Sequence, residues 1–319
     1  MKNRMAMVQS PGLAELVERQ VPKPTDTQVI IAIKACSICG GDLHIYKGKH
    51  PSAPLPMALG HELAGEVVEV GGKVKSVRLG DRVTVEPVIA CGECPPCRSG
   101  VYGYCDNLSY HYRKGQGALA DYFVVDERYV YSLPSHLSYE AGSLIEPLAV
   151  AVHAAKRAKV GLGDEVVIIG AGPIGLLVTA VCRAAGAKEI IVADIADVRL
   201  ETAAKMGATR TINSRQEQVP DVIRQMTGGR GIAKSFECVG REETFIQAMA
   251  CLCKGGLATM LGIFEQPTIQ IPATIFVAQE ITVQGSQGYC WDFPTALGLT
   301  GTIDLDKIVS HVFPLSEVG

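Results

Sequence analysis

Four cysteines lie close together in one proline- and glycine-rich segment of the chain. They are Cys91, Cys94, Cys97 and Cys105, with the spacing C-x2-C-x2-C-x7-C. Four thiolates so close in sequence can complete a tetrahedral shell around one zinc ion, and that shell leaves no position open for a substrate. The spacing therefore predicts a structural zinc site. An iron–sulfur cluster or a redox pair would use the same residue type, but nothing else in the chain indicates electron transfer.

A second chemical pattern is a GxGxxG motif, which spans residues 170–175. In a dinucleotide site the first glycine permits a tight turn, the second lets the pyrophosphate approach the backbone, and the third lets helix and strand pack closely. The N-terminus of the following helix offers free N–H groups to the phosphates. The expected cofactor-binding residues of this turn are Gly170, Gly172, Pro173, Ile174 and Gly175.

An acidic residue, Asp194, follows the motif at the end of the next apolar run. A carboxylate at this place accepts hydrogen bonds from the ribose hydroxyls of NAD and repels the 2′-phosphate of NADP, so Asp194 favours NAD. Arg199 is close enough to weaken that preference, and it is a further cofactor-binding candidate. The structural alternative is an ordinary glycine turn in an α/β sheet, with Asp194 as a helix cap.

The elements that must position this motif alternate along the second half of the chain. The expected order is a strand at 166–169, a helix at 174–185, a strand at 189–193, a helix at 199–206, a strand at 233–238, a helix at 243–253 and a strand at 256–261. Alternating strands and helices predict a doubly wound parallel α/β sheet of the Rossmann type. From about Gly285 the alternation fades, with a helix expected near 293–299 and a strand near 311–313.

The chain before about Pro147 predicts short strands separated by glycines. Residues 29–33 are apolar, and residues 66–70 and 82–85 alternate as half-buried strands do. This β-rich region also contains most of the cysteines. Because a chain of 319 residues exceeds the usual size of one domain, we expect two domains.

The composition is that of a globular protein, with 47% hydrophobic and 20% charged residues and a net charge of −3. There is no basic stripe, so no nucleic-acid partner is expected. The charge-free run from Val166 to Cys182 contains glycines and a proline, so it predicts a strand, a turn and a helix rather than a membrane span. With no recognisable targeting segment, we expect a cytoplasmic location, where clustered cysteines (11 in all) more often bind metal than form disulfides.

Taken in order, the motifs resemble those of the zinc-containing medium-chain dehydrogenase/reductase family, in its sorbitol-dehydrogenase-like and threonine- or butanediol-dehydrogenase-like branch. The matching pieces are CSICGGDLH, ALGHELAGEVVEVG, GDRV, CGECPPCRSGVYGYC, IEPLAVAVHA and GAGPIG. The resemblance implies a GroES-like catalytic domain at 1–149 with its zinc lobe at 91–105, and a Rossmann NAD-binding domain at 150–285. It also implies a return segment to the catalytic domain at 286–319, which is short relative to the family.

The same resemblance implies a catalytic zinc held by Cys39, His61 and a glutamate, either Glu62 or Glu146. Bound zinc is a Lewis acid that favours loss of the proton of an alcohol, and a nicotinamide then accepts the hydride. His44 matches the family's proton-relay histidine, with a surface histidine that caps a turn as the alternative. The family pattern also places four further residues at the cofactor, namely Leu261, Gly262, Ile263 and Ser286.

The resemblance fails at two positions that bear on chemistry, Gly41 and Gly288. Gly41 stands where the family usually has serine or threonine, so proton transfer is expected to use water, the substrate's own hydroxyl or His44. Gly288 replaces the arginine of sorbitol-dehydrogenase-like enzymes, while Tyr289 is kept, so sorbitol itself is a doubtful substrate. Cys36 forms a CxxC with Cys39, but the family motif uses the later cysteine, and we interpret Cys36 as a buried small residue.

The predicted function is zinc-dependent transfer of a hydride between NAD(H) and a small secondary alcohol, polyol or sugar-derived alcohol. The predicted cofactors are one catalytic zinc, one structural zinc and NAD, and a homodimer or homotetramer is expected. An amino-alcohol dehydrogenase acting on a threonine-like substrate is the second enzyme hypothesis. A non-catalytic dinucleotide-binding sensor is the alternative of another class, and the zinc-free quinone-reductase relatives lack these metal ligands.

Overall fold

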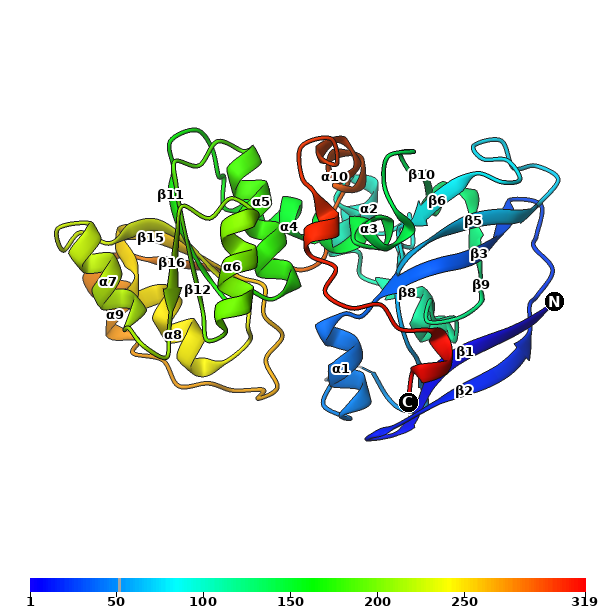
Figure 1. Cartoon of the computed structure of the whole chain (residues 1–319), viewed down its shortest axis with the longest axis horizontal. Helices are drawn as coiled ribbons and strands as arrows, with labels where there is room; N and C mark the ends of the chain where they lie inside the picture. Colours follow the sequence, from blue (N-terminus) through cyan, green and yellow to red (C-terminus); the bar gives the residue numbers. More distant parts are fainter. Residues whose placement is uncertain (51–52) are drawn as a thin grey trace. The chain divides into compact units, whose positions relative to one another are not determined.

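The structure is a computed structural model that describes residues 1–50 and 53–319 (Figure 1). The chain divides into two compact units, the first formed by Met1–Glu146 with Val309–Gly319 and the second by Pro147–Ile308. The expected return segment is thus shared, because residues 286–308 fall in the second unit and residues 309–319 in the first. Each unit has its own sheets and its own hydrophobic core.

The first unit is built around a five-stranded antiparallel sheet with the strand order β10-β6-β5-β3-β9. Its strands are β3 (Gln28–Ser37), β5 (Glu62–Val70), β6 (Arg82–Val85), β9 (Tyr122–Asp126) and β10 (Val130–Ser132). The apolar or alternating stretches predicted at 29–33, 66–70 and 82–85 are confirmed as parts of β3, β5 and β6.

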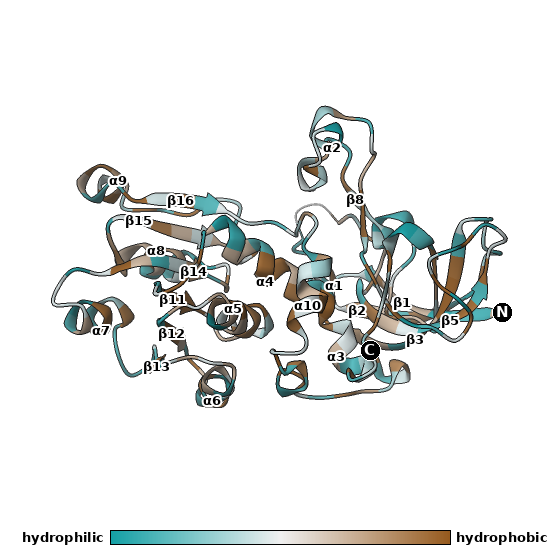
Figure 2. Ribbon diagram, turned by 90° about the horizontal axis from the view of Figure 1, so that it is seen from above, coloured by the Kyte–Doolittle hydropathy of each residue, from teal (hydrophilic) through white to brown (hydrophobic). Residues whose placement is uncertain are grey.

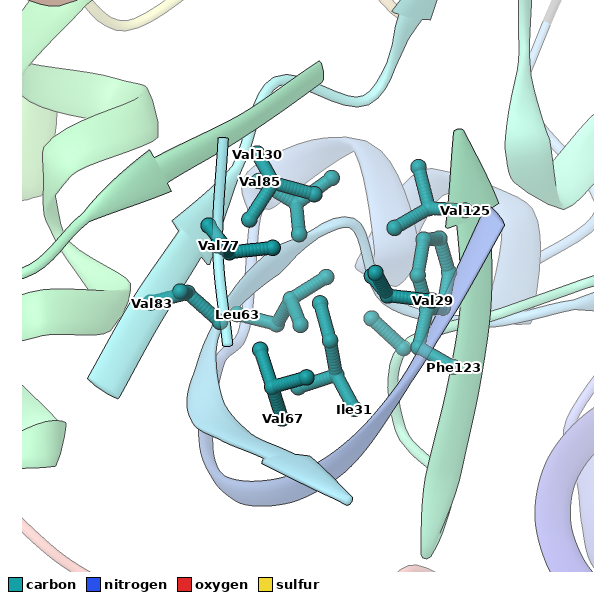
Figure 3. Close-up of a cluster of buried hydrophobic side chains, with 11 residues drawn as sticks. Val29, Ile31, Leu63, Val67, Val77, Val83, Val85, Phe123, Val125 and Val130 are labelled. Atoms are coloured by element: carbon teal, nitrogen blue, oxygen red, sulfur yellow. The ribbon is translucent and has the colours of Figure 1, made fainter. Parts of the chain in front are cut away.

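The core of the first unit is formed by alternate residues of these strands. Val29 and Ile31 of β3 face Leu63 and Val67 of β5, and Phe123 of β9 closes the cluster (Figure 3). All five side chains are at most 1% exposed. Since full burial of such a side chain stabilises a fold by about 1.5–3 kcal/mol, this cluster fixes the register of the strands that carry the candidate site.

Smaller elements complete the first unit. A three-stranded sheet has the order β2-β1-β4, and β7 pairs with β8. The bounds are β1 (Lys2–Ser10), β2 (Leu13–Gln20), β4 (Met57–Ala58), β7 (Val88–Ile89), β8 (Ser109–Tyr110), α1 (Gly40–Tyr46), α2 (Pro95–Arg98) and α3 (Tyr139–Ser143), with the 3-10 helices η1 (Tyr102–Tyr104), η2 (His111–Lys114), η3 (Glu127–Tyr129) and η5 (Leu315–Glu317).

The second unit contains a six-stranded parallel sheet with the order β13-β12-β11-β14-β15-β16, which is the doubly wound Rossmann order. The strands are β11 (Glu165–Ile169), β12 (Glu189–Asp194), β13 (Arg210–Asn213), β14 (Ile232–Glu237), β15 (Leu252–Met260) and β16 (Thr282–Gly285). The predicted α/β fold class is therefore confirmed. Strands β13 and β16 were not predicted from the sequence.

Helices cover both faces of this sheet, with α5 and α7 on opposite sides (Figure 1). On the α7 and α8 side, Val167 and Ile169 of β11 pack with Val222 and Ile223 of α7. The helices and 3-10 turn of this unit are α5 (Pro173–Ala184), α6 (Asp197–Lys205), α7 (Val219–Met226), α8 (Glu242–Ala250), α9 (Thr274–Gln279), α10 (Phe293–Leu299) and η4 (Leu305–Lys307), and α4 (Ile145–Arg157) leads into it.

Two sequence predictions about elements were wrong. The helix expected at 243–253 ends at Ala250, because Leu252 pairs with Ile232 of β14 and begins a strand instead. The strand expected near 311–313 does not form, since no described strand pairs with that segment. Among the described residues, no helix has both the length and the apolar character needed to cross a membrane.

Candidate active site

Three of the predicted ligands of a catalytic zinc come together in the first unit. Ligand atoms of Cys39, His61 and Glu62 all lie within 4.8 Å of one another. Glu62 is 4% exposed, and the other two residues are half-buried. A thiolate, an imidazole and a carboxylate at this separation can bind one zinc ion and leave a fourth position open.

Different elements position each of these side chains. Cys39 follows β3 and is the N-cap of α1, where its Sγ accepts a hydrogen bond from the N–H of Gly41 at 3.3 Å. His61 lies in the short connection between β4 and β5, and Glu62 is the first residue of β5. Because Glu62 pairs with Ser37 at the end of β3, the β3–β5 register brings the two segments together.

Asp42 joins these two ligand-bearing segments, a role that the sequence analysis missed. Its carboxylate accepts hydrogen bonds from the N–H of Cys39 and the N–H of Gly60, each at 3.0 Å, and it is 3% exposed. Charge-assisted bonds to two backbone segments hold the ligand residues in place. The available signal was the capping-box spacing, since Asp42 is three residues after the N-cap Cys39.

The electrostatics of the cluster suit a cation. Burial, together with the nearby carboxyls of Glu62 and Asp42, holds the pKa of the Cys39 thiol well above its usual value. Burial and the neighbouring Glu146 and Asp42 likewise raise the pKa of Glu62. Clustered acidic groups that resist ionisation together are relieved when a divalent cation binds among them.

The imidazole of His61 adds a second sign of fit. Its Nδ1 is buried and accepts or donates no hydrogen bond within the described residues, and it lies 3.9 Å from Oδ1 of Asp42. A buried polar atom without a partner costs free energy unless something satisfies it. The donor set and this atom therefore fit a zinc ion.

The other candidates of the catalytic set lie outside this three-residue cluster. Glu146 is buried at the start of α4 and is near enough to influence the pKa values of Cys39 and Glu62, but it is not within the 4.8 Å group. His44 lies in the last turn of α1 and is not part of that group. A Cβ at Gly41 would contact only Sγ of Cys39, at 3.6 Å, which is an ordinary van der Waals distance. Space alone therefore does not require glycine at this position.

The four predicted cysteines of the second metal site also come together. Their sulfur atoms lie within 4.8 Å of one another, and all four thiols are free. Cys94 is the N-cap of the short helix α2, at the tip of a lobe that projects from the first unit (Figure 2). N–H groups point at the sulfurs, with Cys91 donating to Cys105 at 3.3 Å and Cys94 donating to Cys91 at 3.4 Å.

Those N–H groups favour thiolates. Hydrogen bonds from the backbone of Glu93 and Cys94 lower the pKa of Cys91 to about 6. The lobe is joined to the rest of the unit through Glu86, which is 6% exposed. Glu86 accepts hydrogen bonds from the hydroxyls of Tyr102, at 2.5 Å, and Tyr131, at 3.1 Å. The donor set and its surroundings fit a closed zinc site.

The GxGxxG turn has the geometry that a dinucleotide needs. Gly170 follows β11 with φ of 100°, and a Cβ there would lie 2.6 Å from Val239. A Cβ at Gly175 would lie 1.8 Å from the carbonyl oxygen of Gly170, so helix α5 and the turn touch. Gly172 is the N-cap of α5 and has open space beside it, while Pro173 and Ile174 start the helix.

Asp194 is at the carboxyl end of β12, beside this turn. Its oxygens accept hydrogen bonds from the N–H of Ala171 at 2.7 Å and of Ala196 at 2.9 Å, and the Arg199 guanidinium lies 3.9 Å away. The carboxylate is thus fixed at the edge where dinucleotides bind to such sheets, with oxygen lone pairs left for a ribose.

The remaining cofactor candidates follow the next strands of the same edge. Leu261, Gly262 and Ile263 come after β15, and Ser286 comes after β16 with its Oγ buried and unpaired within the described residues. Glu237, which the sequence analysis missed, lies fully buried at the end of β14. Its Oε1 accepts hydrogen bonds from the N–H groups of Val239 and Gly240 and from the Thr244 hydroxyl, each at 2.8 Å.

Comparison with known protein families agrees with both units. Residues 25–135 match the alcohol dehydrogenase GroES-like domain, and residues 173–301 match the zinc-binding dehydrogenase family. The chain therefore belongs to the zinc-containing medium-chain dehydrogenase/reductase family, as the resemblance of its motifs predicted.

Its relatives include dehydrogenases with different substrates. The chain is 35% identical to the sorbitol dehydrogenase of Bacillus subtilis, over 93% of this chain and 86% of the relative. It is 32% identical to the D-arabitol-phosphate dehydrogenase of Enterococcus avium, over 97% and 90%. An L-threonine 3-dehydrogenase of Coxiella burnetii is 33% identical, over 97% and 91%.

Solved structures are similar over nearly the whole chain. An Escherichia coli oxidoreductase of unknown specificity has a TM-score of 0.94 at 33% identity, with 100% of this chain and 93% of that chain covered. A zinc-binding dehydrogenase from Sinorhizobium meliloti, bound to NADP, has a TM-score of 0.88 at 30% identity, over 96% and 91%. An Escherichia coli alcohol dehydrogenase in complex with NADH has a TM-score of 0.90 at 28% identity, over 99% and 93%.

Proposed function

We propose that this protein is a zinc-dependent oxidoreductase that transfers a hydride between NAD(H) and a small secondary alcohol, polyol or sugar-derived alcohol. The observation that supports this most is the cluster of Cys39, His61 and Glu62 in the first unit, in a chain whose second unit has the glycine turn of a dinucleotide site. A purely dinucleotide-binding protein has no need of a metal site with an open position.

Cys39, His61 and Glu62 would hold the catalytic zinc, with Glu146 beside them, and the four-cysteine lobe would hold a structural zinc. A catalytic zinc supplies Lewis acidity, which favours the deprotonated form of an alcohol. Asp42 holds the two ligand-bearing segments together through the N–H groups of Cys39 and Gly60. With no hydroxyl at position 41, the substrate proton is expected to leave through His44, water or a second hydroxyl of the substrate.

For the cofactor we propose NAD, which accepts or returns the hydride. Asp194 supports NAD over NADP because its carboxylate, 8% exposed, stands beside the glycine turn and would repel a 2′-phosphate. Arg199, 3.9 Å from that carboxylate, partly offsets its charge, so some activity with NADP is expected. The homodimer or homotetramer and the cytoplasmic location expected from the sequence stay predictions; light scattering of the purified protein measures the first.

The direct test is a screen for NAD reduction by the zinc-loaded protein over polyols, diols, sugar acids and amino alcohols, with zinc counted in the same preparation. We expect two zinc ions per chain and NADH formation with a polyol or secondary alcohol, lost on chelation and restored by zinc. A preference for L-threonine and its analogues would favour the amino-alcohol alternative. Tight NADH binding without oxidation of any alcohol would favour the sensor alternative and contradict the proposal.

A further inference from the structure

A buried acid, Glu237, lies at the edge of the parallel sheet that is formed by the carboxyl ends of its strands, and the proposed reaction does not use it. Glu237 is 0% exposed and ends β14, the strand between β11 and β15 (Figure 2). Its Oε1 accepts three hydrogen bonds, from the N–H groups of Val239 and Gly240 and from the hydroxyl of Thr244. One side chain therefore holds the turn that follows β14 and the start of α8.

The other oxygen of this carboxyl group has no comparable partners. Oε2 is buried and has no hydrogen-bond partner among the described residues. It faces Gly262, where an added Cβ would lie 2.5 Å from it, while the N–H of Gly262 donates to the backbone carbonyl of Glu237. No ion pair of the described residues includes Glu237, and Lys234 of the same strand pairs with Asp164 instead. No described cation therefore offsets a charge on this group.

The hydrogen bonds to Oε1 favour a carboxylate. Burial raises the pKa of Glu237, and the donors around the group oppose that rise. A neutral carbonyl oxygen has two lone pairs, so three donors on a single oxygen suit the ionised form better than the protonated one. The edge of the sheet thus contains a buried negative charge.

Three turns of this edge pack together around Glu237. A Cβ at Gly170 would lie 2.6 Å from the side chain of Val239, and a Cβ at Gly240 would lie 2.3 Å from the carbonyl oxygen of Ile263. Gly240 also has φ of 85°, which residues with a side chain rarely adopt. The turns after β11, β14 and β15 are therefore in contact, and Glu237 fixes the middle one.

The place of β14 in the sheet relates this charge to one half of the cofactor. A dinucleotide binds across the point where the strand order reverses, here between β11 and β14, with one mononucleotide on each half of the fold. Asp194, at the end of β12, is the acid expected to bind the adenosine ribose. The nicotinamide half would therefore lie on the side of β14, β15 and β16, which is the side of Glu237.

The two redox forms of the cofactor differ by one charge in that half. The nicotinamide ring of NAD⁺ is positively charged, and the ring of NADH is neutral. A fixed carboxylate inside a protein acts on such a charge without direct contact, because little water screens the interaction. The purely structural alternative is that Glu237 only ties the turns together, a task that an uncharged glutamine could share.

We propose that Glu237 is a positioning residue of the dinucleotide site that also sets its preference between redox forms, because its carboxylate holds the turn after β14 and its charge stabilises bound NAD⁺ relative to bound NADH. This proposal rests on the proposed use of NAD and deepens it. Since Glu237 is fully buried, it acts through the turns and through its electric field rather than by touching the cofactor.

The test measures equilibrium binding of three ligands to the zinc-loaded protein by calorimetry. The ligands are NAD⁺, NADH and ADP-ribose, which lacks the nicotinamide ring. Glu237→Gln removes the charge and keeps an oxygen for the donors of the turn, whereas Thr244→Val removes one donor and keeps the charge. Glu243→Gln is the matched control, because Glu243 is an exposed glutamate at the start of the same helix. Thermal melts and zinc counts show that each variant is folded and loaded.

We expect Glu237→Gln to weaken the binding of NAD⁺ by about 3- to 10-fold relative to that of NADH and of ADP-ribose, the effect of one charge acting through protein rather than through water. Thr244→Val should weaken all three ligands by a similar factor, so that the ratio of NAD⁺ to NADH affinity stays constant. Glu243→Gln should change neither the affinities nor their ratio.

An unchanged ratio of NAD⁺ to NADH affinity in Glu237→Gln would overturn the inference and leave the dehydrogenase function intact. A loss shared equally by ADP-ribose would also overturn it, since that result belongs to the structural alternative. If no alcohol reduces NAD and the ratio still shifts, the proposed function fails and the inference holds. Should Glu237→Gln not fold, Glu237→Met, which is also uncharged and of similar length, is interpreted by the same ratio.

Discussion

The two candidate metal centres of the first unit are assembled in opposite ways. The four-cysteine centre comes from one segment of fifteen residues, at the tip of a lobe, and its sulfurs face backbone N–H groups. The second centre takes Cys39 from the N-cap of α1, His61 from the connection before β5 and Glu62 from the first position of β5, beside the buried Asp42. One centre therefore folds with its own loop, whereas the other exists only when β3 and β5 are paired.

The difference follows from what each site must do. A closed site needs only ligands, so a short loop with the right spacing is enough. A site with an open position must hold its ligands while a substrate comes and goes, and rigid strands with a hydrogen-bonded carboxylate between them supply that. We call the Cys39–His61–Glu62 group the strand-built centre. We expect loss of a ligand from the strand-built centre to lower turnover, and loss of a ligand from the four-cysteine lobe to lower stability.

The largest expected effect comes from the glutamates of the strand-built centre. Glu62→Ala removes a predicted ligand, so we expect it to lower kcat/KM by more than about 1000-fold and to release one zinc ion. Glu146→Ala removes a neighbour that is not in the ligand group, so turnover should fall by about 10- to 100-fold with zinc retained. Glu69→Ala, on the exposed part of β5, is the control and should change neither quantity.

The reverse pattern, zinc loss in Glu146→Ala and zinc retention in Glu62→Ala, would give the third ligand position to Glu146. Steady-state kinetics with metal analysis of the same samples separates the two outcomes.

Removal of a ligand from the lobe should act on stability first. Cys94→Ala is expected to lose one zinc ion and to lower the free energy of unfolding by on the order of 4 kcal/mol, because the loop between β7 and β8 then has little else to fold around. Thermal melts and limited proteolysis of the lobe measure this. Cys253→Ala, in β15 and outside both clusters, should melt near the wild type. A Cys94→Ala protein with unchanged melting would mean that the lobe does not need metal.

A smaller effect is expected at the base of the lobe, where His111 follows β8. Burial against Phe123 and Tyr129 lowers the pKa of His111 to about 4. Between pH 6.5 and 4 the unfolded chain therefore binds a proton that the folded chain does not, so stability falls with falling pH, by roughly 3 kcal/mol at most. His111→Phe should remove this part of the acid sensitivity. Denaturant unfolding curves at several pH values test it, and equal pH slopes for both proteins would refute it.

The sequence alone predicted one of the two metal centres much better than the other. The spacing of the four cysteines is a local signal, and it placed the lobe without any knowledge of the fold. The order of strands and helices around residues 166–194 was similarly readable, because the apolar runs and the glycine turn are contiguous.

The strand-built centre had no such local signal. Cys39 and His61 are far apart in the sequence and meet only through the pairing of Ser37 with Glu62, so only resemblance to a family suggested them. The role of Asp42 depends on two hydrogen bonds across that junction. The end of α8 at Ala250 was mispredicted for the same reason. Leu252 pairs with Ile232 of β14, which is distant in the sequence, and local propensity does not reveal this pairing.

The most direct test of the account measures both the zinc content and NADH formation in Cys39→Ala, with Cys36→Ala, near the end of β3, as its control. We predict that Cys39→Ala keeps one zinc ion, melts near the wild type and forms no NADH with any alcohol that the wild type oxidises, while Cys36→Ala keeps two zinc ions and turnover. Full turnover or two bound zinc ions in Cys39→Ala would contradict the assignment of the catalytic centre.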